Sequence, residues 1–312
     1  MQTGSIGSLN VSLVGLGCNN FGWSLDATAT ARVVHAALDA GINFFDTADI
    51  YGSTKSEVFL GLALAGRRHQ AVIATKFGMK VDDARQGARP DYVRRAVEDS
   101  LRRLNVDRID LYQLHTPDPS VPIGETLGAL DELVRSGKVG EIGCSNFSVD
   151  QIREARKAAG DAAHFVSVQN EYSLLHREPE GGVLDECTRT GMAFLPFFPL
   201  ASGLLTGKYG AKGTPAPSGS RLAGTTPLSG RFLSDENLAA VERLTAFASR
   251  RGRTLLELAM SWLAARPAVA SVIAGATSVE QVRANAAAVS WRLDPAELAE
   301  IDTLAPASPA AS

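Results

Sequence analysis

Residues 42–46, INFFD, form a short apolar run that ends in an aspartate, and residues 71–76, AVIATK, form a second run that ends in a lysine. A third run at residues 109–115, IDLYQLH, ends in a histidine. Short runs rich in β-branched and aromatic residues are typical of buried β-strands. A titratable residue therefore closes each of three successive predicted strands, and we expect the ends of these strands to carry the chemistry.

Similar apolar runs alternate with helical patterns along the whole chain. The predicted strands are residues 12–16, 42–46, 71–75, 109–114, 139–144, 165–169, 193–197 and 271–274. Strand–helix alternation implies right-handed crossovers and a parallel sheet. Eight such units in 312 residues favour a closed (β/α)8 TIM barrel over an open doubly wound sheet. Nothing resembles a domain linker, so we expect one domain over residues 1–305 and a disordered tail at 306–312.

The helical patterns carry their apolar residues on one face and often stop at a glycine. The predicted helices are residues 28–40, 91–104, 124–136, 148–159, 235–251 and 254–265, of which the last two are additional to the alternating units. Residues 208–231 are rich in Gly, Pro, Ser and Thr, and they predict a long flap without regular structure before the last strand. A loop of that length in a compact domain is usually functional or disordered.

The composition is that of an ordinary globular protein. Apolar residues make up 45% of the chain, charged residues 21%, and the net charge is −3, which gives no indication of a nucleic-acid or anionic-membrane surface. Cys18, Cys144 and Cys187 lack the spacing of a disulfide framework or metal site, so we expect no metal and a reducing, cytoplasmic location. No secretory signal and no apolar stretch long enough to span a bilayer is visible, so we expect no membrane insertion.

Two glycine-containing segments superficially resemble phosphate-binding loops. Gly15 and Gly17 lack the third glycine and the following helix that a Rossmann fingerprint requires. The segment GLLTGKY at residues 203–209 is one residue short of a P-loop and has Tyr209 in place of the Ser or Thr that holds magnesium. Neither motif is specific, although Lys208 remains able to bind a phosphate as a point charge.

Four residues form the stronger signal. The carboxyl ends of barrel strands meet at one mouth, so Asp46, Lys76 and His115 would converge there with Tyr51, which lies in the loop after Asp46. A free tyrosine has a pKa of about 10, and a lysine ammonium about 4 Å away favours the phenolate by on the order of 3 pKa units before desolvation opposes it. Taken singly, each residue is more often a turn former, a solvated lysine or a core histidine. Their convergence indicates a proton donor for a carbonyl.

The sequence resembles the aldo-keto reductase family over nearly its whole length. The matching segments are, in order, GINFFDTADIYG, IATKFG, IDLYQLH, VGEIGCSNF, VQNEYSLL, FPLASGLLTGKY and GATSVEQVRAN. The pattern is most similar to bacterial members and to potassium-channel β subunits. The resemblance implies a β/α barrel that binds NADP(H) without a Rossmann domain and reversibly reduces a small-molecule carbonyl substrate to an alcohol.

The resemblance also implies a role for each of the four residues. Tyr51 would be the general acid that protonates the carbonyl oxygen. Lys76 would supply the charge that tunes Tyr51, Asp46 would pair with Lys76, and His115 would orient the substrate oxygen. No metal is needed, since Tyr51 and His115 can act as a preorganised oxyanion site.

The cofactor site follows from the same resemblance. Ser145, Asn146 and Gln169 would hydrogen-bond the nicotinamide carboxamide, and Phe197 would stack on its ring. The other implied contacts are those of the pyrophosphate with Pro199, Leu200, Gly203, Leu204 and Lys208, of the 2′-phosphate with Arg221, and of the adenosine with Gly275, Thr277, Gln281 and Asn285.

One departure from the family concerns the adenosine pocket. Ala284 stands where relatives often have a glutamate, and positions 275 and 281 lack the Lys or Arg that some relatives use to grip the 2′-phosphate. We therefore expect NADPH to be favoured over NADH on the strength of Arg221, Thr277 and Gln281.

Aromatic residues near the predicted strand ends indicate a substrate rim. Phe21 and Trp23 follow the first strand and Phe77 follows Lys76, which suits a hydrophobic carbonyl compound or the face of a sugar. The sequence does not indicate whether the chain forms a homo-oligomer.

Two other functions compete with a carbonyl reductase. One is a cofactor-binding regulatory or redox-sensing subunit with little turnover, which the channel-subunit resemblance allows. The other is an aldolase that uses Lys76 as a Schiff-base nucleophile. Trapping of a lysine adduct with borohydride would identify the aldolase.

Overall fold

The computed structural model describes residues 1–209, 216–224 and 226–305. Eight parallel strands form one sheet in the order β10-β3-β4-β5-β6-β7-β8-β9. Their bounds are β3 Val14–Gly17, β4 Phe44–Asp46, β5 Val72–Phe77, β6 Ile109–Leu114, β7 Val139–Ser145, β8 Ser167–Glu171, β9 Ala193–Phe197 and β10 Val272–Gly275. The two ends of the sheet meet where Phe194 N donates to Ala268 O at 2.7 Å and Ala270 N donates to Phe194 O at 3.1 Å. The predicted (β/α)8 TIM barrel is confirmed, and every predicted strand end lies within two residues of the observed one.

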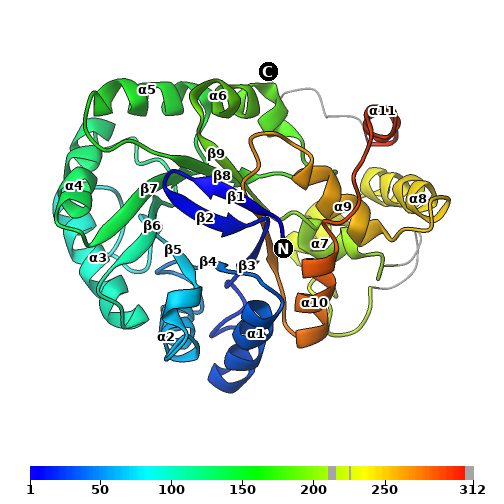
Figure 1. Ribbon diagram of the computed structural model, residues 1–312, viewed down its shortest axis with the longest axis horizontal. Coiled ribbons are helices and arrows are strands. Elements are labelled where there is room, and N and C mark those ends of the chain that lie inside the picture. The colour runs from blue at the N-terminus through cyan, green and yellow to red at the C-terminus, as the bar shows by residue number, and fades with distance from the viewer. Residues whose placement is uncertain (210–215, 225, 306–312) are drawn as a thin grey trace.

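Helices surround the barrel (Figure 1). They are α1 Ala27–Asp39, α2 Lys55–Ala63, α3 Pro90–Leu104, α4 Ile123–Arg135, α5 Val149–Ala159, α6 Val183–Thr190, α7 Pro227–Phe232, α8 Asp235–Ser249, α9 Leu255–Ala264, α10 Val279–Ala287 and α11 Pro295–Leu304, with 3-10 turns at η1 Arg68–Gln70, η2 Glu178–Gly181 and η3 Ala201–Thr206. Local capping explains the start of α5, where Ser148 and Gln151 form a reciprocal capping box. None of the described helices has the length and apolar character needed to cross a bilayer.

The predicted flap needs a correction. Its carboxyl-terminal part contains α7, which begins at Pro227 behind a capping box between Thr226 and Ser229. Proline is well tolerated at the first position of a helix, so the proline that argued against regular structure begins a helix here. The parts of the flap at residues 210–215 and 225, and the predicted tail at 306–312, lie outside the described residues.

An amino-terminal hairpin that was not predicted covers one end of the barrel. Strands β1 (Thr3–Ile6) and β2 (Leu9–Ser12) pair antiparallel and lie across the centre of the view in Figure 1. Ile6 and Val11 are completely buried and join the core inside the barrel. A Cβ atom at Gly4 would lie 2.3 Å from Ala270 O, so the hairpin sits directly against the barrel wall.

Side-chain alternation along the strands separates two cores. In β5, Ala74 belongs to the core inside the barrel, whereas Ile73 and Phe77 belong to the core between the strands and the helices. Successive side chains of a strand point to opposite faces, so Lys76 shares the inward face of Ala74, and Thr75 shares the outward face of Phe77. This period-two pattern fixes which residues can reach the centre of the barrel.

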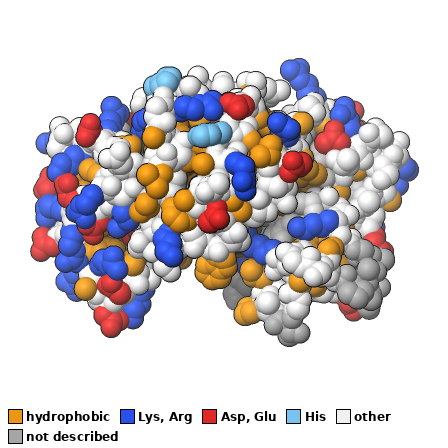
Figure 2. Space-filling view, turned by 90° about the horizontal axis from the view of Figure 1, so that it is seen from below, with side chains coloured by type: hydrophobic (Ala, Val, Ile, Leu, Met, Phe, Trp, Pro, Cys, Tyr) orange, Lys and Arg blue, Asp and Glu red, His pale blue; other side chains and the backbone are white. Residues whose placement is uncertain are grey.

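The outer surface carries charges of both signs. Figure 2 shows Lys and Arg side chains interspersed with Asp and Glu side chains, most densely on the left, which is the side of α3 in Figure 1. Arg94 of α3, for example, pairs with Glu132 of α4 at 2.8 Å. Such mixing is typical of a solvated surface.

Candidate active site

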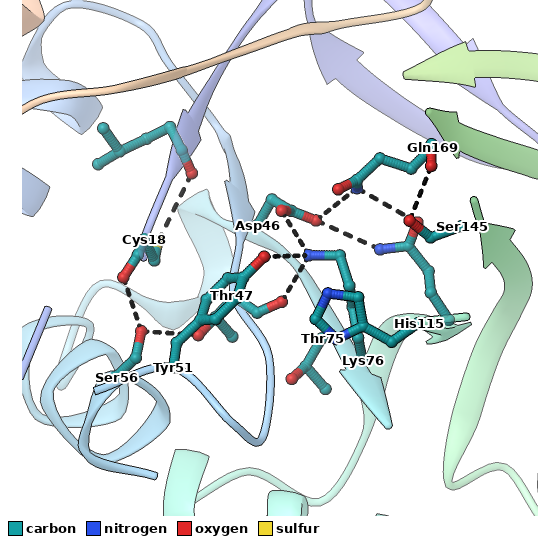
Figure 3. A network of polar contacts seen from close by, with 12 residues as sticks. Cys18, Asp46, Thr47, Tyr51, Ser56, Thr75, Lys76, His115, Ser145 and Gln169 are labelled. Atoms are coloured by element: carbon teal, nitrogen blue, oxygen red, sulfur yellow. Dashed lines mark hydrogen bonds and ion pairs between the residues drawn. The ribbon is translucent and has the colours of Figure 1, made fainter. Parts of the chain in front are cut away.

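A buried ion pair lies inside the barrel at the ends of β4 and β5. Lys76 Nζ is 2.6 Å from Asp46 Oδ2, and the two side chains are 0% and 4% exposed. Lys76 also donates to the carbonyl oxygen of Thr47 at 2.9 Å (Figure 3). Two buried charges are stable only when each is compensated, and here each is the other's partner.

Two glutamines complete the surroundings of Asp46. Its Oδ1 accepts from Gln169 Nε2 at 2.9 Å and from Gln113 Nε2 at 3.2 Å. Gln113 was not among the predicted site residues, although a pattern in the sequence places it in the site. It lies two residues before His115 in IDLYQLH, so strand alternation places it on the inward face.

Tyr51 lies close to the lysine ammonium. Lys76 Nζ donates to Tyr51 OH at 3.4 Å, and the Tyr51 ring meets the His115 ring edge-on at 5.7 Å between centroids. Burial raises the pKa of Tyr51, and the opposing effect of Lys76 is smaller, so the net shift is upward. Lys76 therefore acts in the predicted direction, but desolvation outweighs it, and Tyr51 holds its proton at neutral pH.

Lys76 keeps its positive charge despite burial. Desolvation lowers its pKa, but Asp46 and then Tyr51 raise it by more, and the net shift is upward. An ammonium has no free electron pair with which to attack a carbonyl carbon. The arrangement therefore disfavours Lys76 as a Schiff-base nucleophile.

His115 is neutral. Burial, followed by the charge of Lys76, lowers its pKa well below the ordinary value. Its Nδ1 is buried and has no hydrogen-bond partner among the described residues. A neutral imidazole has one N–H donor, so His115 can direct a hydrogen bond toward an oxygen beside Tyr51. No group of three or more His, Cys, Asp or Glu side chains suited to a metal ion occurs in the described part of the chain.

The residues assigned to the nicotinamide adjoin this cluster. Ser145 Oγ donates to the carbonyl oxygen of Gln169 at 2.7 Å, and Asn146 Nδ2 donates to Ser145 Oγ at 3.2 Å and to His115 O at 2.9 Å. Gln169 links both sets, since its amide also donates to Asp46. The structure thus brings Ser145, Asn146 and Gln169 together with the four predicted catalytic residues.

The segment after β9 has an unusual backbone. Ala201, Ser202 and Gly203 have successive positive φ angles of 45°, 56° and 96°. Strained conformations of this kind concentrate at ligand-binding segments, where successive N–H groups can face an anion. A Cβ atom at Gly203 would lie 3.1 Å from Lys208 Nζ, so the missing side chain leaves room for the exposed ammonium over the backbone. The N–H groups of Ala201 and Gly203 donate within the segment, to Phe198 O at 2.9 Å and Leu200 O at 2.8 Å, so the group that suits a pyrophosphate here is the Lys208 ammonium.

The remaining side chains of this segment differ in exposure. Pro199 and Leu204 are buried, whereas Phe197 and Leu200 are half-buried. Arg221, from the described part of the flap, lies with its guanidinium 5.7 Å from the ring centroid of Phe198. The structure thus joins the flap to the strand end that carries Phe197.

The residues predicted to hold the adenosine lie at the end of β10, in the turn after it and in α10. Gly275, Thr277 and Gln281 are exposed, and Thr277 N donates to Gln281 Oε1 at 2.7 Å. Asn285 is buried, and its Nδ2 donates to Gly275 O at 3.4 Å. Hydrogen bonds therefore link the end of β10 and the turn after it to α10 through these four residues.

Comparison with known proteins decides the family. The model of the aldo/keto reductase family matches residues 13–306. The chain belongs to the aldo/keto reductase family. The family resemblance inferred from the motifs is thereby confirmed, and the chain is an oxidoreductase of a family that uses nicotinamide cofactors.

The relatives of this aldo/keto reductase include enzymes and a channel subunit. The structure of a glycerol dehydrogenase from Gluconobacter oxydans has a TM-score of 0.84 and 31% identity, with 98% of this chain and 97% of the other covered. An aldo-keto reductase from Bacillus halodurans in its holo form has a TM-score of 0.82 and 34% identity, with 99% and 96% covered. A protein from Oryza sativa subsp. japonica, named a probable voltage-gated potassium channel subunit beta, is 35% identical over 274 residues, which are 85% of this chain and 83% of that protein.

The predicted aromatic rim of this aldo/keto reductase needs a correction. Trp23 is 86% exposed, but Phe21 and Phe77 are completely buried. Strand β5 continues through Phe77, so alternation turns its side chain outward, where its ring stacks on Tyr112 at 4.7 Å. Phe21 and Phe77 are therefore core residues, and Trp23 is the one predicted rim residue that the structure leaves exposed.

Proposed function

We propose that this chain is an NADPH-dependent carbonyl reductase that reversibly converts an aldehyde, ketone or sugar carbonyl into an alcohol, with Tyr51 as the general acid. One observation carries the proposal. The Tyr51 hydroxyl, which holds its proton at neutral pH, lies 3.4 Å from a buried ammonium and beside a neutral imidazole. A proton donor, a positive charge and an N–H donor thus converge on one point.

In the proposed reaction each residue has its own step. Nicotinamide cofactors supply a hydride when they are bound. As negative charge develops on the carbonyl oxygen, Tyr51 transfers its proton to that oxygen, and the Lys76 ammonium stabilises the phenolate that remains. Asp46 and its glutamine donors fix Lys76, and His115 donates a hydrogen bond to the same oxygen. In the reverse direction the Tyr51 phenolate accepts the proton of the alcohol.

The site residues also support a preference for NADPH. Lys208 and the backbone around Gly203 would hold the pyrophosphate, and Arg221 would contribute positive charge for the 2′-phosphate. We expect Arg221→Ala to raise the KM for NADPH while the KM for NADH stays unchanged. Equal increases for both cofactors would contradict this assignment.

The decisive experiment measures NADPH oxidation with a panel of aldehydes, ketones and ketosugars. Tyr51→Phe removes the transferable proton and is expected to lower kcat by about 10²–10⁴-fold, the usual contribution of general acid catalysis. NADPH binding, followed by fluorescence titration, should persist. Tyr112→Phe is a matched control, since its hydroxyl lies on the outer face of β6 without a partner among the described residues. Unchanged turnover in the Tyr51 variant, or absence of NADPH binding, would refute the proposal.

The similarity to the rice protein favours a second candidate, a cofactor-binding regulatory subunit. A subunit of that kind would bind NADPH and associate stably with a membrane protein. Its turnover on every carbonyl of the panel would be no higher than that of the Tyr51→Phe variant. Turnover well above that background assigns the enzymatic function instead.

A further inference from the structure

A second buried polar cluster lies on the outer face of β5, behind the Asp46–Lys76 pair. Thr75 points away from the Lys76 ammonium (Figure 3), and its Oγ1 donates to Glu57 of α2 at 2.6 Å. Glu57 in turn pairs with Arg103 of α3 at 2.6 Å, with side-chain exposures of 0% and 16%. The charges of Glu57 and Arg103 therefore compensate each other.

Asp49 is the member of this cluster whose carboxyl has no compensating charge. The residue is 3% exposed, and its Oδ2 accepts one long hydrogen bond, from Tyr92 OH at 3.4 Å. Its Oδ1 is buried and has no partner among the described residues. Within the same residues, no Lys, Arg or His nitrogen lies at ion-pair distance from it.

The backbone of Asp49 belongs to the loop that carries Tyr51. Thr47 N donates to Ala74 O at 2.9 Å, and Asp49 N donates to Lys76 O at 3.1 Å, so the loop extends the ladder between β4 and β5. Tyr51 N then donates to Ala48 O at 3.2 Å. The loop is therefore held to Lys76 by its backbone and to α3 by the Asp49 side chain.

We propose that Asp49 is a positioning residue for Tyr51, and that it holds the loop in its protonated, uncharged form. The proposal rests on the proposed function of Tyr51 as the general acid. A proton on the carboxyl removes a buried charge that no cation neutralises. Above the pH at which that proton is lost, the cluster holds two carboxylates, Asp49 and Glu57, against the single cation Arg103. The excess negative charge then displaces the loop, and Tyr51 moves away from Lys76.

The groups that face Asp49 agree with this assignment. Glu57 of α2 raises its pKa, and Arg103 and Tyr92 of α3 and the backbone at Ile50 lower it. Burial is the largest effect, and together these influences raise the pKa of Asp49 from 3.8 to about 7. On the β6 side the facing group is the Tyr112 phenol. Burial and then Asp49 raise its pKa, so it is neutral and does not compensate a charge on Asp49.

The test compares the pH dependence of kcat in the wild-type protein and in Asp49→Asn, with saturating NADPH and carbonyl substrate. Asparagine keeps the shape of the uncharged carboxyl but cannot ionise. We expect wild-type kcat to fall through an apparent pKa near 7, and the variant to lose that step. The kcat values of wild type and Asp49→Asn should agree within about twofold at pH 6 and differ at least threefold at pH 8.5. Asp83→Asn, which changes an exposed aspartate, is the matched control and should follow the wild-type curve.

A measurement without substrate separates this proposal from the proposed function. In protein labelled at the aspartate carboxyl carbons, the ¹³C signal that disappears in Asp49→Asn should titrate near pH 7. If no carbonyl is turned over, the proposed function fails, and a signal that titrates near pH 4 instead refutes the protonated state. If Asp49 titrates near pH 7 but the kcat profiles of wild type and Asp49→Asn run parallel, the positioning role is overturned.

Discussion

Asp46 ends strand β4 and Asp49 lies in the loop that follows; both aspartates are buried, yet their carboxyl groups have opposite surroundings. Asp46 faces the inside of the barrel, where Lys76 lies 2.6 Å away and two glutamine amides donate to it. Asp49 faces the helices, where the charge with the largest effect on its pKa is a second carboxylate, Glu57. The cost of burying a carboxyl is offset by an ion pair on one side of β5 and by a proton on the other. The two carboxyl groups therefore differ in whether a cation among the described residues lies at ion-pair distance from them.

We expect the largest effect on the free energy of unfolding from removing Lys76, the cation inside the barrel. Lys76→Met leaves Asp46 buried without a counter-charge, and the free energy of unfolding should fall by roughly 3–5 kcal/mol. Reductase turnover should be lost as well. Urea unfolding followed by circular dichroism measures the change. The double variant Asp46→Asn, Lys76→Met should recover most of the stability but none of the activity, and a double variant as unstable as the single one would contradict the pairing.

Asp49, which faces the helices, should lower the free energy of unfolding when it is ionised. Its pKa is higher in the folded chain than in the unfolded one, so the folded state binds the proton more tightly, and stability falls as the pH rises from about 4 to about 7. The shift from 3.8 to about 7 corresponds to on the order of 4 kcal/mol at most. Asp49→Asn avoids this loss, so it should exceed wild type in stability above pH 7, with the gap closing toward pH 4. Urea midpoints at pH 4.5, 6 and 8.5 provide the test, and a gap independent of pH would count against it.

Adjacent residues of β6 extend the comparison to neutral groups. Gln113 points inward and donates to Asp46, so Gln113→Leu should cost about 1–3 kcal/mol, the usual effect of removing a hydrogen bond to a buried charge. Tyr112 points outward, and its hydroxyl has no partner among the described residues. Tyr112→Phe should therefore be neutral or slightly stabilising. Equal losses in the two variants, measured by urea unfolding, would show that the two faces do not differ in this way.

The smallest effect should come from an ion pair in solvent. Lys80 and Asp83 also lie 2.6 Å apart, but their side chains are 61% and 94% exposed. Water already solvates both charges, so the pair contributes little. We expect Asp83→Asn to leave the urea midpoint unchanged within error, in contrast to the large effect of breaking the Asp46–Lys76 pair at the same distance. A loss comparable to that of Lys76→Met would show that burial is not the deciding factor.

Local pattern was sufficient to predict the barrel and the convergence of the four site residues. Strand β6, for example, has the predicted bounds, because its apolar run begins after a polar turn and ends at His115. The same alternation would have placed Gln113 inward and Phe77 outward. Phe77 was mistaken for a rim residue because the strand was taken to end before it, and a difference of two residues at a strand end changes whether a side chain faces substrate or core.

Other features depended on contacts between distant segments. The charge state of Asp49 follows first from its burial and then from Glu57 of α2, which Arg103 of α3 opposes, and no local sequence pattern reports how these helices pack. Likewise the net pKa shift of Tyr51 required the extent of its burial. The β1–β2 hairpin did have a local signal, a Gly-Ser turn between short alternating segments, with Gly7 at φ 54°.

The hairpin has a kinetic consequence. Within the described residues, Ile6 and Val11 close the amino-terminal end of the barrel, so we expect ligands to enter at the opposite end. In the proposed reaction two molecules must use that route, and Ser145 and Gln169, which are assigned to the nicotinamide, lie deep in the barrel beside Asp46. The molecule that occupies the deeper position must arrive first and depart last. Turnover then follows a compulsory order, and departure of the oxidised nucleotide sets the steady-state rate whenever it is slower than hydride transfer.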